Sequence, residues 1–186
     1  MSKIRAFIAL NTSEQAQSKI FEIQEYLSDI KSDIKWEPRE KFHITLKFLG
    51  DVEENILKNI TEELRYELNN FGNFPIEYRS LGVFPNLKLP KVLWIGASDK
   101  EKKVFGLNKT IEANVKNYNF DDESKRFHPH ITLGRVKGIR GVKEVIEMMQ
   151  QHGHEGIIDS ASEICIMKST LTREGSFYGV VDKIKL

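Results

Sequence analysis

The chain has 186 residues, 40% of them hydrophobic, and can therefore bury one core of the size usual for a single domain. Its 28 lysines and arginines almost balance its 27 aspartates and glutamates, so the formal charge of +1 provides no overall field that would draw the protein onto a polyanion. The single cysteine, Cys165, excludes an internal disulfide framework and a cysteine-based zinc cluster. No stretch approaches the roughly 20 apolar residues of a membrane span, so we expect a cytoplasmic protein.

The first half of the chain has the pattern strand, helix, strand, helix, strand. Residues 4–10 form a short apolar run that is typical of a strand. Apolar side chains recur every three or four residues through 20–30 and again through 56–71, which predicts two amphipathic helices. Between these helices, residues 42–50 alternate apolar and polar side chains as a half-buried strand does, and 76–84 closes the half as another strand.

The second half repeats this order of elements. The patterns predict a strand over 92–96, a helix over 104–115, a strand over 127–134 and a helix over 142–149, and then terminal strands over 164–167 and 177–181. The repeated order indicates an internal duplication.

We therefore expect one domain, 1–186, with approximate pseudo-repeats 1–86 and 90–186. The predicted fold is α+β and bilobal, with two pseudo-symmetric lobes that are each a mainly antiparallel sheet covered by two helices. The uncovered faces of the sheets would meet across a central cleft. No long heptad array is evident, so a monomer is expected.

The tetrapeptide His-Ile-Thr-Leu occurs twice, beginning at His43 and at His130, in equivalent places of the two halves. Side chains at positions i and i+2 share one face of a strand, so Thr45 lies beside His43 and Thr132 beside His130. The apolar residues between them point the other way and hold the strands to the core. A pseudo-twofold axis would bring both pairs into the cleft.

Two imidazoles and two hydroxyls fit the hydrolysis of a cyclic phosphodiester. This reaction needs a base for the attacking water, an acid for the leaving oxygen and donors for the phosphoryl oxygens. A histidine pKa near 6.5 lets one imidazole be neutral and the other protonated near neutral pH, so we expect a bell-shaped pH dependence. No metal or cofactor is required, and the residues alone leave the two histidine roles interchangeable.

The tetrads and their surroundings resemble the two-histidine (2H) phosphoesterases, and within them the bacterial and archaeal RNA 2′,3′-cyclic phosphodiesterases, also called 2′-5′ RNA ligases. The resemblance covers nearly the whole chain. Besides the tetrads, its matching pieces are 5–10, Trp36, 46–50, 82–85, 92–96 and 129–135.

This resemblance implies a bilobal fold and the hydrolysis of cyclic RNA ends to 2′-phosphomonoesters, with reverse 2′-5′ ligation as a secondary activity. It assigns His43 as proton donor to the leaving oxygen and His130 as proton acceptor from water. Thr45 and Thr132 would hold the phosphate oxygens. The implied partner is RNA with a 2′,3′-cyclic phosphate end, tRNA fragments included, and no obligate protein partner is evident.

Three further residues are candidates for substrate contact. Lys47 shares the predicted face of His43, and Arg135 follows the second tetrad, so both are candidates for phosphate. Tyr178 offers an aromatic surface on which a terminal base can stack, whereas the alternation of side chains places Phe42 in the core.

Other interpretations remain open at this point. His128 and His130 resemble a metal pair, but no third ligand stands nearby at a recognisable spacing, so no metal site is expected. The same two-histidine chemistry also suits a phosphodiesterase for small cyclic or 2′-5′ linked nucleotides. A non-catalytic RNA-binding module that keeps the cleft is the alternative from a different class.

Overall fold

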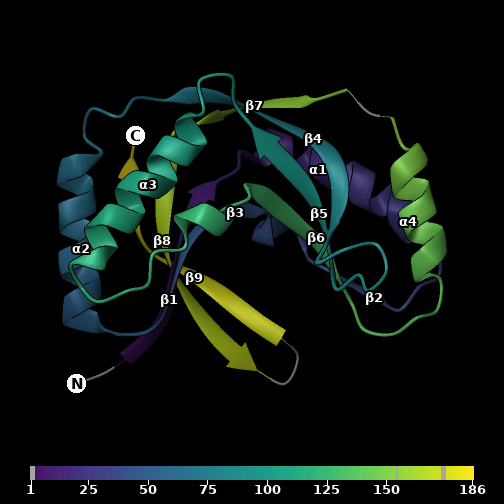
Figure 1. Ribbon diagram of the computed structural model, residues 1–186, viewed down its shortest axis with the longest axis horizontal. Coiled ribbons are helices and arrows are strands. Elements are labelled where there is room, and N and C mark those ends of the chain that lie inside the picture. The colour runs from purple at the N-terminus through teal and green to yellow at the C-terminus, as the bar shows by residue number, and fades with distance from the viewer. Residues whose placement is uncertain (1–2, 154, 173–174) are drawn as a thin grey trace.

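The computed structural model describes residues 3–153, 155–172 and 175–186, which form two antiparallel sheets with two helices beside each (Figure 1). The first sheet has the order β3-β1-β8-β9, with β1 at Lys3–Asn11, β3 at His43–Glu53, β8 at Glu163–Thr172 and β9 at Gly175–Lys185. The second has the order β2-β6-β5-β4-β7, with β2 at Ile34–Trp36, β4 at Phe74–Phe84, β5 at Val92–Ser98, β6 at His130–Val136 and β7 at Ile157–Ala161.

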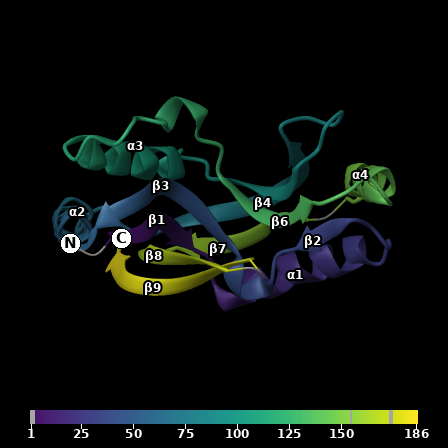
Figure 2. The same cartoon turned by 90° about the horizontal axis from the view of Figure 1, so that it is seen from below.

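The helices lie at the two ends of the molecule. Figure 2 shows α2 and α3 at the end that contains the first sheet, and α1 and α4 at the other end. Their bounds are Glu14–Ser28 for α1, Glu54–Glu67 for α2, Lys103–Lys116 for α3 and Val142–Gln151 for α4. The expected bilobal α+β fold, with two helices for each antiparallel sheet, is confirmed. Among the residues described, no helix is long and apolar enough to cross a membrane.

Each sheet combines strands from both halves of the chain, which corrects the expectation that each half builds one lobe. β8 and β9 complete the first sheet, whereas β4 lies inside the second. The helices are exchanged in the same way, since α1 lies beside the second sheet and α3 beside the first (Figure 1). A short connection joins β4 to β5, and antiparallel strands joined in this way pair with each other, so β4 follows β5 into the second sheet.

The exchange leaves the two sheets with matching strand orders. When β3-β1-β8-β9 is placed beside β6-β5-β4-β7, every strand of the first sheet has a counterpart, and β2 adds to the outer edge of β6. In this correspondence α3 of the first lobe matches α1 of the second. The residue bounds of the pseudo-repeats, 1–86 and 90–186, stay a prediction.

The core uses the faces that the sequence patterns indicate. Ile20, Ile23 and Leu27 of α1 are buried, and so are Ile60 and Leu64 of α2. Burial of such side chains is the main favourable contribution to folding. The patterns did not reveal β2 and β7, which have three and five residues and are too short to show a period.

Both strands that begin with a histidine carry a one-residue bulge directly after the threonine. The extra residue is Leu46 in β3 and Leu133 in β6, and the residues on either side of it pair with adjacent residues of the neighbouring strand. An extra residue reverses the face on which the side chains directly after it lie. The simple alternation expected from the sequence therefore ends at these two leucines.

Candidate active site

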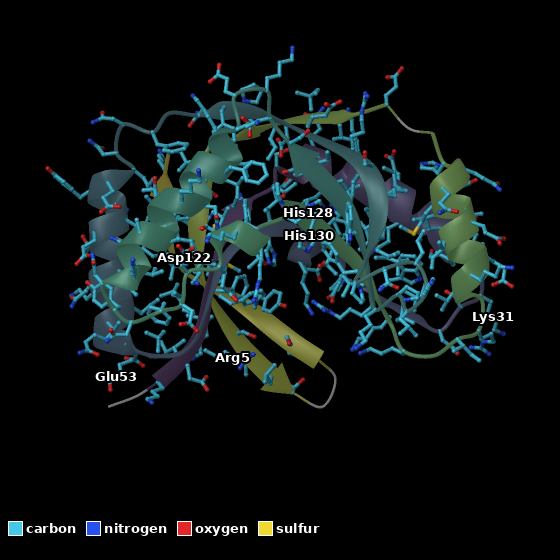
Figure 3. The ribbon with its side chains drawn as sticks, viewed as in Figure 1. Arg5, Lys31, Glu53, Asp122, His128 and His130 are labelled. Carbon is cyan, nitrogen blue, oxygen red and sulfur yellow. The ribbon has the colours of Figure 1, made fainter. Side chains whose placement is uncertain are left out.

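The four tetrad side chains line one cleft of about 220 Å³ between the two sheets. They are His43 and Thr45 from β3 and His130 and Thr132 from β6, two strands that contact each other where the sheets meet. Figure 3 shows His130 near the centre of the molecule, between the two pairs of helices. The rest of the lining is Phe7, Glu37, Lys41, Phe48, Phe84, Val92, Arg135 and Tyr178.

The orientation of His130 follows from a hydrogen bond to the backbone. Its Nδ1 lies 2.6 Å from the carbonyl oxygen of His128. A carbonyl oxygen only accepts, so Nδ1 carries the proton, and Nε2 of the neutral ring keeps a lone pair. Phe84 meets the ring edge-on, with 5.0 Å between the centroids. This tautomer is the one that a general base requires.

His43 is held by an equivalent contact. Its ring bonds to the backbone of Lys41, two residues earlier, as His130 does to His128. Phe7 stacks on the ring of His43 at 5.2 Å between centroids, and Tyr178 meets it edge-on at 5.7 Å. The aromatic contacts fix the plane of the ring.

Both imidazoles are less basic than a free histidine. Burial lowers the pKa of His43 to about 4, although the bond to the backbone of Lys41 opposes this shift. Burial also lowers the pKa of His130. Burial therefore favours the neutral form of both rings in the free protein, and the expectation that one ring is protonated when it reacts stays a prediction. An anion between them would raise both pKa values, because it stabilises the imidazolium form.

Lys47 does not face the cleft, so the expectation that it contacts phosphate is corrected. The bulge at Leu46 turns Lys47 to the opposite side of β3, where the residue is 3% exposed. Its Nζ lies 3.0 Å from Glu112 of α3 and 3.6 Å from Glu123. It also donates a hydrogen bond to the backbone carbonyl of Asp121. The ammonium group of Lys47 therefore forms ion pairs on the side of β3 away from the cleft.

The same bulge brings Phe48 into the cleft. Its place in the alternation predicted a core residue, but Phe48 is 63% exposed and lines the cleft, with its ring centroid 5.9 Å from that of Phe7. Phe42, in contrast, is buried as predicted. Sequence reasoning missed Phe48 because it assumed an unbroken strand.

Arg135 reaches the cleft for the same structural reason. Simple alternation would place it opposite Thr132, but the bulge at Leu133 turns it to the side of Thr132. Phe48 and Arg135 each stand three residues after the threonine of their tetrad, so the repeat itself contained the signal that they occupy equivalent positions.

Besides the histidines, the charged side chains that line the cleft are one carboxylate and two cations. Nε of Arg135 donates to Oε1 of Glu37 at 3.0 Å, and Nζ of Lys41 lies 3.7 Å from Oε2 of the same carboxylate. Lys41 also lies over the ring of Tyr178, 5.3 Å from its centroid. Tyr178 thus lies in the cleft, where it was expected to contact substrate. Two cations and one carboxylate leave these side chains with a net positive charge suited to an anion. Sequence reasoning also missed Glu37, which lies outside both tetrads.

The structure gives His128 no evident role as a ligand. Its exposed ring lies 6.1 Å from that of His130 between centroids, and it lines a second cavity of about 190 Å³ next to the cleft. Within the described ranges, no three His, Cys, Asp or Glu side chains are grouped so that they could hold a metal ion.

Comparisons with known proteins show a shared family. Residues 10–94 match a family described as LigT like phosphoesterase. A protein of Aquifex aeolicus (strain VF5) named RNA 2′,3′-cyclic phosphodiesterase is 34% identical over 100% of this chain and 99% of its own. A protein with the same name from Methanothermobacter thermautotrophicus (strain Delta H) is 31% identical over 99% of this chain and 100% of its own.

Solved structures have the same fold. The crystal structure of a Thermus thermophilus protein matches with a TM-score of 0.78 and 25% identity, over 98% of this chain and 97% of its own. The apo form of E. coli LigT matches with a TM-score of 0.76 over 100% of this chain and 99% of its own, and its 18% identity supports the fold alone.

Proposed function

Since this chain belongs to the LigT-like phosphoesterases of the two-histidine superfamily, we propose that it hydrolyses the 2′,3′-cyclic phosphate ends of RNA to 2′-phosphomonoesters. The observation that carries the proposal is the pair of histidines that line one cleft, each beside a threonine. The relatives that are named for this activity support the choice of substrate. In addition, E. coli LigT was crystallised with 3′-AMP, a nucleotide with one phosphate on its ribose.

In the proposed mechanism His130 is the base and His43 the acid. Nε2 of His130 takes a proton from water, whose oxygen attacks phosphorus, while the bond from phosphorus to O3′ breaks and O3′ takes a proton from His43. One bond to phosphorus forms and one breaks, which leaves the phosphate on O2′. The lone pair on Nε2 of His130 supports its role, whereas the choice of His43 as the acid rests on the resemblance.

The remaining polar groups would hold the phosphate. The hydroxyls of Thr45 and Thr132 would donate to its non-bridging oxygens, and Arg135 would supply a positive charge beside them. The phosphate in turn would raise the pKa of His43, so we expect proton uptake to accompany substrate binding. Tyr178 and Phe48 would contact the ribose or base. Physiological substrates such as tRNA fragments, the reverse 2′-5′ ligation, a cytoplasmic location and a monomeric state stay predictions.

We expect kcat/KM to follow a bell-shaped pH profile with its maximum on the acid side of pH 6.5. His43 must be protonated to react, and because its pKa in the free protein is about 4, its protonated fraction falls as pH rises. His130 must be neutral to accept a proton, and because its pKa is lowered, it stays mostly neutral until the pH falls below 6.5. Initial rates from about pH 4 to 9 measure this profile. A flat profile would refute the acid–base pair.

The first test of the function is to incubate the protein, in excess EDTA, with an RNA oligonucleotide that ends in a 2′,3′-cyclic phosphate. We expect a 2′-phosphate product at a rate that EDTA does not change. Loss of turnover in EDTA would contradict metal independence, and a 3′-phosphate would contradict the bond assignment. Turnover of a cyclic mononucleotide without turnover of the oligonucleotide would favour a small-nucleotide enzyme.

A further inference from the structure

Each bulge beside the active site is held by one buried amide side chain of a helix. Nε2 of Gln24 in α1 donates to the carbonyl oxygen of Leu133 at 2.7 Å, and Nδ2 of Asn108 in α3 donates to the carbonyl oxygen of Leu46 at 2.8 Å. Gln24 is 3% exposed and Asn108 2%. The two amides therefore have the same task in counterpart helices, because a bulge leaves backbone groups that need a partner.

Gln24 donates a second hydrogen bond, which distinguishes it from Asn108. Its Nε2 also donates to the carbonyl oxygen of Glu37 at 2.8 Å, and the backbone N–H of Glu37 donates to the carbonyl of Leu133 at 2.8 Å. One side chain thus ties the backbone of Glu37 to the bulge of β6. The carboxylate of Glu37 in turn accepts from Nε of Arg135 at 3.0 Å.

Gln24 therefore bonds to the backbone of both segments that place Arg135. The bulge at Leu133 turns Arg135 toward the cleft, and Glu37 holds its Nε, so that the remaining guanidinium N–H groups are available for an anion. β2, which ends just before Glu37, lies closely against the bulge. A Cβ on Gly134 would lie only 2.7 Å from Cγ2 of Ile34, so a shift in one strand would move the other.

We propose that Gln24 is a positioning residue that aims Arg135 at the phosphate, although Gln24 itself does not line the cleft. The proposal rests on the proposed function, whose anion site it deepens. A guanidinium binds phosphate oxygens well only when its planar fork is held in register with them. Through its bonds to Leu133 and Glu37, Gln24 holds the guanidinium of Arg135 in this position.

A double-mutant cycle with Arg135 tests this role. Gln24→Leu keeps most of the side-chain volume but removes both donated bonds. We expect it to lower kcat/KM for a cyclic-phosphate RNA about tenfold, mainly through KM, and to weaken binding of inorganic phosphate by a similar factor. In an Arg135→Ala background the same change should cause almost no further loss, because its effect passes through Arg135.

Asn108→Leu is the matched control, since it removes an amide that holds the equivalent bulge of the other lobe. The fold-loss in kcat/KM that it causes should be the same in the Arg135→Ala background as in the unmodified protein, because the two effects are independent. If Gln24→Leu likewise causes the same fold-loss in both backgrounds, Gln24 is merely structural and the proposal is overturned. If Gln24→Leu fails to fold, Gln24→Asn, which keeps an amide on a shorter stem, enters the same cycle.

The two proposals can fail separately in this experiment. If the unmodified protein hydrolyses no cyclic phosphate but binds inorganic phosphate, the proposed function is overturned, while the cycle measured by phosphate binding still decides on Gln24. If the unmodified protein hydrolyses the cyclic phosphate and Gln24→Leu causes the same fold-loss with and without Arg135, only the role of Gln24 is overturned.

Discussion

Replacing His43 or His130 by alanine is expected to lower kcat for a cyclic-phosphate RNA by about 10²–10⁴-fold, with a much smaller change in KM. In the proposed mechanism each replacement removes a group that transfers a proton in the transition state but leaves the threonines and Arg135 to bind the phosphate. Initial-rate kinetics with the oligonucleotide described above measure both constants. The double variant should be little worse than either single one, because the two groups act as a unit.

His128→Ala is the matched control for the histidine variants. It removes an exposed imidazole next to His130 but leaves the backbone carbonyl of His128 that orients the His130 ring. We expect it to lower kcat less than about tenfold, which is below the roughly 10²–10⁴-fold that a general acid or base contributes. A loss at His128 equal to that at His130 would contradict the assignment of the base. Unchanged kcat in His43→Ala would contradict the assignment of the acid.

Lys47→Met is expected to lower the free energy of unfolding by about 3–5 kcal/mol, because it leaves the buried carboxylate of Glu112 without its partner. Urea denaturation measures the change. The double variant Lys47→Met with Glu112→Gln should recover part of the loss, since no uncompensated charge then remains.

Lys143→Met is the surface control for this prediction. Lys143 forms an exposed pair with Glu147, at 3.5 Å, and such pairs contribute about 0–1 kcal/mol. Measuring the phosphate affinity of Lys47→Met distinguishes the buried ion pair seen in the structure from the phosphate contact expected from the sequence. Unchanged stability together with a large loss of phosphate affinity would show that Lys47 is a ligand after all.

The sequence predicted correctly which face of each strand lines the cleft, but only as far as the threonine. His43 and Thr45 are two residues apart, and period two holds over that distance. The next residues, Leu46 and Lys47, are both buried, and no pattern announces that one of them is extra. Because a long lysine can stand on either face of a strand, its sequence position did not reveal the bulge or the buried ion pair.

The repeat was visible in the sequence, but the way its copies are combined was not. The order of apolar patterns indicates where strands lie, whereas the edge that each strand pairs with depends on the length and path of its connections. β4 has the pattern expected of a strand and still pairs with β5 of the other half. Glu37 was hidden for a related reason, since it becomes important only when β2 pairs with β6.

The exchange of strands also sets an order for folding as the chain is synthesised. β1 pairs with β3 on one edge and with β8 on the other, and the nearest pair across the second edge, Leu10 with Ile164, is 154 residues apart in the chain. That edge stays open until β8 and β9 emerge, and contacts of such separation form slowly. Tyr178 of β9, which packs against His43, arrives with them. We therefore expect a nascent chain to remain inactive, with an edge that needs protection from other chains, well after both histidines have been made.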